Sequence, residues 1–286
     1  MPPRATLHHV THYRYDRPVQ LGPHLVRLRP APNGRSRILW YAMTVEPADA
    51  HVHWHQDPYA NYQARLLFPQ RTPEFKVTVD LTVELAPFNP FEFFVEPGAA
   101  LFPFRYEAPL ASDLAAYRVA DPAGPQLQAY LDRIDRSPQP SVAFLVDLNR
   151  RLRADVQYLR RSEPGVQTPE ETLARGSGSC RDSSWLLVQL LRHLGLAARF
   201  VSGYLIELSP GAETGNELHA WCEVYLPGAG WLGLDPTSGL VASEGHIPLA
   251  CTPDPASAAP VEGLLERTGV TFAHHMQVTR LPVPPP

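Results

Sequence analysis

The chain has 286 residues, 44% of them apolar, a formal net charge of −4 and a pI near 6.3. This length suits one large domain or two ordinary ones with a sizeable core, and the charge gives no electrostatic basis for nucleic-acid binding. No apolar run reaches the length of a membrane span, so we expect none. The first residues lack the apolar run of a secretion signal, and three cysteines cannot pair completely. We therefore expect a cytoplasmic protein with free thiols.

The first part of the chain, residues 5–107, is expected to be β-structure. The run VTVDLTVEL (77–85) alternates apolar and polar residues, which is typical of a strand with one buried face. The run DPYAN (57–61) predicts a turn between two strands. Prolines recur and no helix of useful length fits, so an antiparallel β-sandwich is the simplest architecture.

Helical patterning begins after residue 124, at about 126–134 and 141–158. The capping box TPEE (168–171) opens a short helix that Gly176 can end. The next helix is expected from Cys180 to Leu194, and strands carrying His219 and Asp235 follow a strand at 197–208 and a polar loop at 209–217.

These elements predict an α+β protein. Its expected parts are a β-sandwich domain (1–107), a connection (108–124), a catalytic core (125–250), and a C-terminal strand with a proline-rich tail that resembles a linker to further domains (251–286).

Cys180 is the first residue with evident chemistry, because it follows Gly178 and Ser179 at the predicted start of a helix. The unpaired N–H groups and the dipole at a helix N-terminus favour the thiolate, and the same groups can stabilise an oxyanion beside the sulfur. An isolated cysteine is more often buried and inert. A position at the helix start, outside its apolar face, favours a nucleophile.

His219 and Asp235 are the candidate partners of this thiol. In the strand-like run LHAWCEVYL (218–226) the even-numbered positions are wholly apolar, so Cys222 is predicted to pack in the core while His219 lies on the other face. Taken singly, His219 could be an ordinary strand histidine, and Asp235 a turn residue before Pro236. Together the three suit an activated nucleophile, its base and a residue that orients the base.

Four blocks of sequence together resemble the transglutaminase-like superfamily, and most closely its bacterial branch of proposed cysteine proteases. They are GSCRD (178–182), LGLAARFVSGY (194–204), HAWCEVY (219–225) and GWLGLDPT (230–237). The run LHHVTHYRY (7–15) and the turn at 57–61 resemble the β-rich domain that precedes the core in that branch. The resemblance implies a papain-like core with Cys180 as nucleophile, His219 as general base and Asp235 as the residue that orients the imidazole.

The resemblance also implies a second oxyanion donor upstream of the cysteine helix, for which Gln157 and Tyr158 are the candidates. Arg181 and Asp182 either line the site or hold the helix start. Trp221 and Trp231 either wall a substrate groove or pack in the core. The sequence from residue 246 to 255 departs from the Gly-Arg-Asp-Tyr-like stretch of the relatives, which suggests a unit at the start of a longer protein.

Two metal-binding alternatives are weaker, and we expect neither a metal nor a cofactor. His51, His53 and His55 alternate along one strand-like run, but no carboxylate or cysteine completes a ligand set, so a solvated histidine face is simpler. The three cysteines show no C-x-x-C pairing.

The expected reaction is acyl transfer from an amide bond of a peptide or protein through a thioester. Resolution by water would make the enzyme a peptidase, isopeptidase or amidase, and resolution by a primary amine would make it a transglutaminase. We favour hydrolysis because the bacterial branch leans that way by resemblance and no calcium-loop pattern is present. The third alternative is a non-catalytic binding module of a larger protein, although inactive relatives usually lack one triad member and this chain retains all three candidates.

Overall fold

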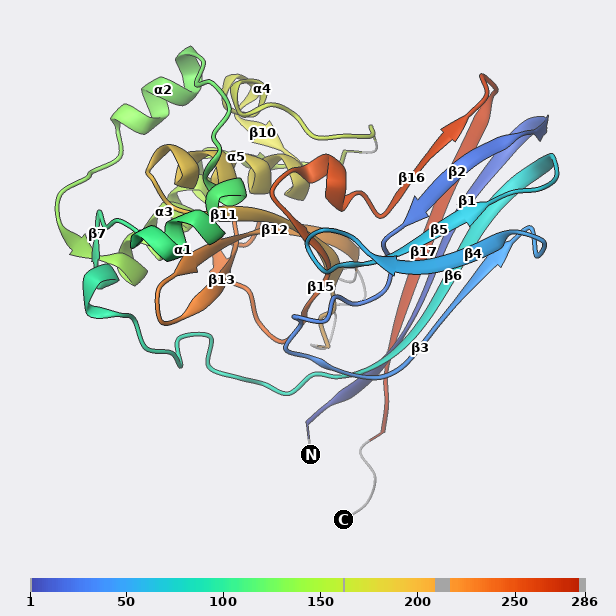
Figure 1. The fold of residues 1–286 in the computed structure, drawn as a ribbon, viewed down its shortest axis with the longest axis horizontal. Coiled ribbons are helices and arrows are strands. Elements are labelled where there is room, and N and C mark those ends of the chain that lie inside the picture. The colour runs from blue at the N-terminus through green and yellow to red at the C-terminus, as the bar shows by residue number, and fades with distance from the viewer. Residues whose placement is uncertain (1, 162, 209–216, 283–286) are drawn as a thin grey trace.

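The computed structural model describes residues 2–161, 163–208 and 217–282, which form two lobes (Figure 1). The sandwich lobe comprises residues 2–85 and 261–280, and the helical lobe comprises residues 101–258. Within the described ranges, no helix is both long and apolar enough to cross a membrane.

The sandwich lobe consists of two four-stranded antiparallel sheets. The first has the order β17 (Val270–Arg280), β1 (Arg4–Val19), β6 (Thr72–Glu84) and β3 (Arg37–Glu46). The second has the order β16 (Val261–Leu265), β2 (Leu21–Val26), β5 (Tyr62–Leu67) and β4 (His51–Gln56). The alternation predicted at 77–85 is confirmed, because its apolar side chains are at most 2% exposed and lie in the layer between the sheets.

The C-terminal segment completes both sheets: residues 251–286 were expected to hold one strand and a linker-like tail, and they hold two strands of the sandwich. β17 pairs with β1 from Ala5↔Arg280 to Tyr15↔Val270, and β16 pairs with β2. From Ala5 to Arg14, β1 therefore has a hydrogen-bonded partner strand on each side. Nearly all side chains of β17 are exposed, so the strand lacks the alternation that would have predicted it. Residues 283–286 of the predicted proline-rich tail and most of the predicted loop at 209–217 lie outside the described residues.

Residues 86–100 cross to the helical lobe, so the sandwich ends near residue 85 and not at 107 (Figure 1). β7 (Leu101–Phe102) pairs with β8 (Gln139–Pro140), and the ring of Phe102 stacks on Phe144 with centroids 3.7 Å apart. The predicted connection at 108–124 contains α1 (Ala108–Asp113) and a 3-10 helix (Ala115–Arg118).

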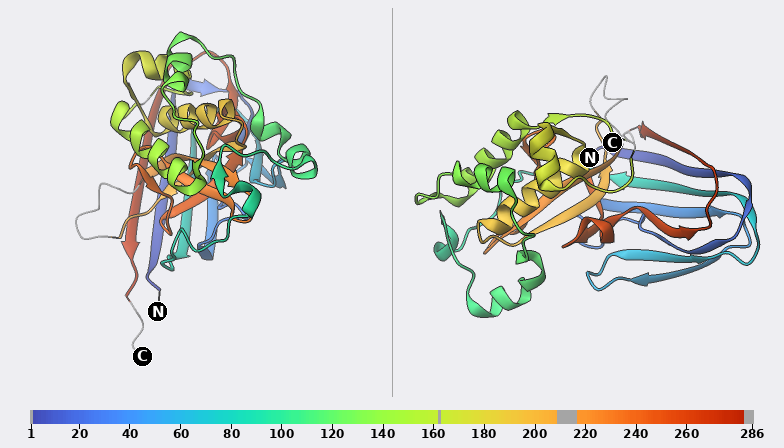
Figure 2. Two further views of the ribbon diagram at one scale, coloured as in Figure 1. Left: turned by 90° about the vertical axis from the view of Figure 1, so that its left-hand side faces the viewer. Right: turned by 90° about the horizontal axis from the view of Figure 1, so that it is seen from above.

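The helical lobe is built on a five-stranded antiparallel sheet, and Figure 2 shows all the long helices in this lobe, beside the sandwich. The sheet has the order β14 (Leu240–Val241), β13 (Gly230–Asp235), β12 (Glu217–Leu226), β11 (Ala198–Leu205) and β15 (His246–Thr252). The helices are α2 (Pro125–Asp132), α3 (Ser141–Asp155), α4 (Pro169–Arg175) and α5 (Cys180–His193). The predicted capping box of α4 is confirmed, with Gly176 ending that helix at φ 59°.

The predicted apolar face of β12 is also confirmed. Ala220, Cys222 and Val224 pack with the apolar side chains of α5 in the core of the helical lobe. Trp221 lies on the opposite face, where it packs against Val201. This alternation decides which side chains of β12 point away from the α5 core.

The two lobes share apolar and polar contacts. Side chains from the β11 and β15 region, including Tyr204 and Leu249, pack into the core of the sandwich. Asn61, in the predicted turn at 57–61, donates to the backbone oxygen of Cys251 at 3.1 Å and accepts from its N–H at 2.8 Å. These contacts hold the edge of the helical-lobe sheet against the sandwich.

Candidate active site

Cys180 is the first residue of α5, and a buried carboxylate fixes that helix start. Asp182 accepts hydrogen bonds from the backbone N–H and the hydroxyl of Ser179 at 2.9 and 2.7 Å, and from the N–H of Gln167 at 2.7 Å. Arg161 binds both of its oxygens at 3.0 Å. Burial opposes ionisation of Asp182, but these hydrogen bonds outweigh burial and lower its pKa. Of its two predicted roles, the structure gives Asp182 the one that holds the helix start.

The strand pair before α5 brings Tyr158 alongside the helix start. In the parallel ladder of β9 (Gln157–Tyr158) and β10 (Ser177–Gly178), Tyr158 lies opposite Gly178. A Cβ atom on Gly178 would lie 2.8 Å from the Cβ of Asp182, so only glycine permits this close approach. The run GSC therefore reflects tight packing just ahead of the thiol.

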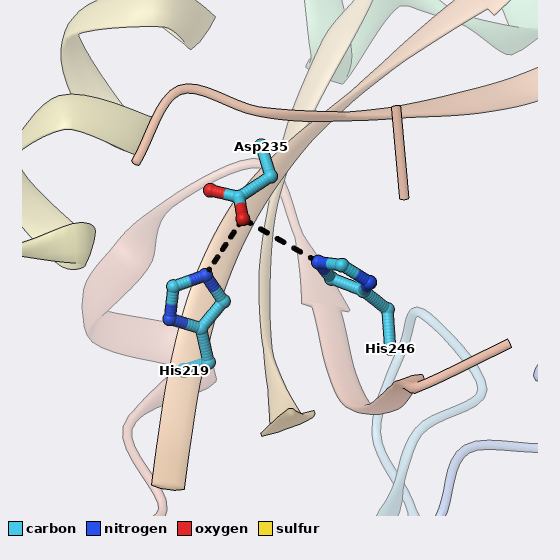
Figure 3. A group of neighbouring side chains, drawn as sticks. All are labelled: His219, Asp235 and His246. Carbon is cyan, nitrogen blue, oxygen red and sulfur yellow. Dashed lines mark ion pairs between the residues drawn. The ribbon is translucent and has the colours of Figure 1, made fainter. Parts of the chain in front are cut away.

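His219 is held by Asp235 through its Nε2 atom. His219 Nε2 lies 3.2 Å from Asp235 Oδ2 (Figure 3). Both side chains are almost completely buried. Cys222 pairs with Leu234 across β12 and β13. In this register His219 and Asp235 lie on the same face of the sheet, opposite the face of Cys222 and Leu234. Asp235 also accepts from the N–H of Thr237 at 2.8 Å and the hydroxyl of Ser238 at 3.0 Å.

The electrostatics favour a charged imidazole beside an ionised carboxylate. Burial lowers the pKa of His219, but its interactions with Asp235, Cys180 and Glu217 outweigh burial and raise that pKa far above the ordinary histidine value. Burial raises the pKa of Asp235, but its contacts with His219 and His246 outweigh burial and lower it. An imidazolium between a thiol and a carboxylate can stabilise a thiolate. Neither ring nitrogen of His219 makes a well-aligned hydrogen bond with the described residues, and such bonds are often loose before substrate binds.

Glu217 and Tyr158 complete the cluster around the thiol. Glu217 Oε1 lies 3.6 Å from His219 Nδ1, and its other oxygen is 3.3 Å from Arg160 Nη2. Burial raises the pKa of Tyr158, and the charges of Glu217 and Cys180 raise it further, so its hydroxyl remains a hydrogen-bond donor. Of the two oxyanion candidates, Tyr158 is half-buried and has a pKa that the charge of Cys180 raises, whereas Gln157 is exposed.

The remaining predicted site residues lie away from the thiol or support it indirectly. Arg181 donates to the backbone oxygens of Arg161 and Glu163 at 2.9 and 3.0 Å, which ties the preceding loop to α5. Trp221 and Trp231 line a cleft of about 280 Å³ on the face of the sheet opposite the α5 core, and Cys180 does not line that cleft. They wall a groove that Cys180 does not line but that His246, beside Asp235, does.

The described residues contain one cluster with the composition of a metal site, formed by His219, Asp235 and His246. The histidines of β4 form no such cluster with the other described side chains. All three cysteines are free and buried.

His246 and Glu217 were not predicted as site residues from the sequence. His246 Nε2 lies 3.5 Å from Asp235 Oδ2 (Figure 3). His246 begins β15, which joins the sheet beside β11 and not beside β13, so no local pattern indicates its approach to Asp235. Glu217 does carry a signal, because a residue two positions before His219 lies on the same face of a strand.

A cysteine at a helix start, with a histidine and an aspartate on neighbouring strands, is the arrangement found in folds that use a cysteine nucleophile. Residues 5–84 match the family model described as the bacterial transglutaminase-like N-terminal region, and residues 128–236 match that of the transglutaminase-like superfamily. The chain therefore belongs to the transglutaminase-like superfamily, as predicted, and carries the N-terminal region of its bacterial members.

Relatives and solved structures agree with this assignment. The chain is 30% identical over 278 residues to Rv2569c of Mycobacterium tuberculosis, covering 92% of this chain and 87% of that protein. It is 25% identical over 289 residues to ML0607 of Mycobacterium leprae, covering 97% and 99%. A protein from Cytophaga hutchinsonii proposed to be a cysteine protease has the same fold, with a TM-score of 0.74, 18% identity, and coverage of 99% of this chain and 92% of that chain. The predicted α+β fold class is thus confirmed, and the superfamily indicates thiol-based catalysis in general.

Proposed function

We propose that the protein is an enzyme that cleaves amide bonds of a peptide or protein by acyl transfer to Cys180, followed by hydrolysis of the thioester. One observation carries the proposal: the His219 imidazole interacts with the Cys180 thiol at the start of α5 and with the Asp235 carboxylate. The superfamily supports the thiol chemistry. The shared fold with a protein proposed to be a cysteine protease supports water as the acceptor.

In the first half of the reaction, the Cys180 thiolate attacks the amide carbonyl and forms a tetrahedral oxyanion. The His219 imidazolium then gives its proton to the leaving amine, the C–N bond breaks, and a thioester remains. In the second half, neutral His219 takes a proton from water, whose oxygen attacks the thioester. The acid product leaves, and thiolate and imidazolium are restored.

The oxyanion has two donors in reach of this arrangement. The first N–H groups of α5 have no partner within the helix, so the N–H of Cys180 can face the developing charge. The Tyr158 hydroxyl, which keeps its proton, can supply the second hydrogen bond.

Thiol labelling tests the nucleophile without knowledge of the substrate. At neutral pH, iodoacetamide is expected to modify Cys180 about 100-fold faster or more than Cys222 and Cys251. Both of those thiols are at most 1% exposed, and burial raises the pKa of Cys222 well above the usual value and that of Cys251 to about 12. Peptide mass spectrometry over time measures the three rates. Equal rates at all three thiols would favour the alternative of a non-catalytic binding module.

Asp235→Asn tests the residue that orients the base. The amide cannot neutralise an imidazolium and can present an N–H where His219 needs an acceptor, so we expect kcat/KM to fall by about 10⁴-fold with little change in KM. The far-UV circular dichroism spectrum checks that the variant folds. A loss of less than tenfold in a folded variant would remove Asp235 from the triad.

The acceptor is tested with a library of glutamine-containing and other peptides, incubated with and without a fluorescent primary amine. Hydrolysis predicts free acid products whose amount does not depend on the amine. Incorporation of the amine without free acid would show a transglutaminase instead.

We further propose that the protein works in the cytoplasm without nucleic-acid or membrane partners. Three free buried cysteines and a net charge of −4 support this assignment. Cell fractionation with an antibody tests it, and recovery in a membrane or extracytoplasmic fraction would refute it.

A further inference from the structure

Two histidines approach the same oxygen of Asp235. His246 Nε2 lies 3.5 Å from Oδ2, the atom that His219 Nε2 approaches at 3.2 Å (Figure 3). The His246 ring meets Trp221 edge to face, with centroids 5.1 Å apart and planes at 86°, and its side chain is 9% exposed. Packing therefore fixes the plane of a ring that the proposed reaction does not use.

A hydrogen bond at the other ring nitrogen, Nδ1, shows which nitrogen of His246 carries the hydrogen. The backbone N–H of Ser243 donates to His246 Nδ1 at 3.2 Å, so Nδ1 must offer a lone pair. In a neutral imidazole the hydrogen then lies on Nε2, which faces Asp235. His246 Nε2–H thus faces the carboxylate at 3.5 Å, a contact that is not a well-aligned hydrogen bond in this structure.

This tautomer also argues against a metal ion in the same place. The ligand atoms of His219, Asp235 and His246 lie within 4.8 Å of one another, which is compatible with a shared ion. A metal on His246 Nε2 would need the lone pair there and would move the hydrogen to Nδ1. That hydrogen would then face the N–H of Ser243.

We propose that His246 is a positioning residue that donates its Nε2–H to Asp235 and so holds the carboxylate where it stabilises the His219 imidazolium. This role rests on the proposed function of Cys180. Ser238 is the other donor to Oδ2, and Thr237 binds Oδ1, so loss of His246 leaves the oxygen that faces His219 with one fixed donor fewer. The carboxylate can then turn away from the imidazole, which loses its fixed orientation beside Cys180.

Two substitutions separate donation from packing. His246→Gln removes the ring but can place an amide N–H near the position of Nε2. His246→Phe keeps a ring against Trp221 but has no donor. For His246→Phe we expect the rate of Cys180 alkylation at neutral pH to fall about 10- to 100-fold, and for His246→Gln we expect it to stay within about threefold of the wild type. The thermal midpoints of both variants check that they fold.

His24→Gln is the matched control, because His24 is buried against Phe68 and Phe75 in the sandwich and touches no residue of the triad. It should leave alkylation of Cys180 unchanged. The opposite pattern, in which His246→Phe labels like wild type and His246→Gln loses labelling, would assign His246 a packing role and overturn the proposal.

Nuclear magnetic resonance of ¹⁵N-histidine provides a readout that does not depend on a reactive thiol. The expected spectrum shows His246 as the Nε2–H tautomer, and His246→Phe shifts the His219 ring signals. A proton on Nδ1 of His246, or one equivalent of Zn²⁺ bound by the wild type and lost in His246→Phe, would overturn the proposal. If Cys180 of the wild type proves unreactive while the histidine signals behave as expected, the proposed function fails and the positioning contact stands.

Discussion

Replacing Cys180 by serine is expected to lower the amide-cleaving activity by about 10⁴-fold or more while the protein remains folded. A serine hydroxyl must lose its proton to a neutral base as it attacks. The interactions of His219 with Asp235 and Glu217 keep the imidazole charged, so it is poorly suited to accept that proton. The site therefore favours a nucleophile that is already ionised. Steady-state kinetics on an amide substrate of the wild type measure the loss, and the thermal midpoint should move by no more than about 2 °C.

Cys222→Ala provides the matched control for this substitution. Cys222 is fully buried among apolar side chains of the α5 core, so its truncation should cost stability but leave the activity of the folded protein intact. Cys180→Ser activity within tenfold of the wild type, or loss of activity in folded Cys222→Ala, would remove Cys180 from its proposed role.

The features that the sequence predicted well are those with a local pattern. The alternation of β6 and of β12, the capping box of α4 and the start of α5 each depend on residues close together in the chain. The three triad candidates belong to such segments, and strand alternation already separated His219 from Cys222. Their meeting around the thiol also needed the resemblance, because spacing alone does not order the strands.

The features that could not be predicted depend on contacts between distant segments. β17 has no fully buried side chain, and its pairing with β1 shows that the chain returns to the sandwich. His246 lies at the start of β15, which joins the sheet beside β11, yet its ring packs against Trp221 and reaches Asp235. The carboxylate of Asp182 binds Arg161, which lies 21 residues earlier in the chain. No local sequence pattern indicates this contact.

Breaking the ion pair of Asp182 and Arg161 is expected to have the largest effect on stability. Asp182 is completely buried and Arg161 is 12% exposed, and each Asp182 oxygen accepts hydrogen bonds from at least two donors. In Asp182→Asn, either orientation of the amide turns its NH₂ toward groups that are themselves donors, and the charge of Arg161 loses its partner. Removal of one member of a buried ion pair costs about 3–5 kcal/mol, so the thermal midpoint should fall by on the order of 10 °C.

The capping box of α4 is the matched control for Asp182→Asn, because it has the same pattern at the surface. Glu171 Oε2 alone accepts from the N–H and hydroxyl of Thr168, and a glutamine oxygen can replace it. Glu171→Gln should therefore cost about 1 kcal/mol or less. Urea denaturation measures both variants, and a cost below 1 kcal/mol for Asp182→Asn would contradict the prediction.

Asp182→Asn also tests whether an intact start of α5 is needed for the reactivity of the Cys180 thiol. Asp182 is the contact that fixes Ser179 at the start of α5, so its loss should let the first turn fray and move Cys180 relative to His219. We expect Cys180 in Asp182→Asn to lose most of its labelling advantage over Cys222 under conditions where the protein is still folded. Arg161→Gln separates the two contributions, because Asp182 then keeps its donors from Ser179 and Gln167 and loses only the guanidinium, so Cys180 should keep its labelling advantage in this variant. Fast labelling of Cys180 in a folded variant with a frayed helix start would show that the imidazole alone, and not the helix N-terminus, activates the thiol.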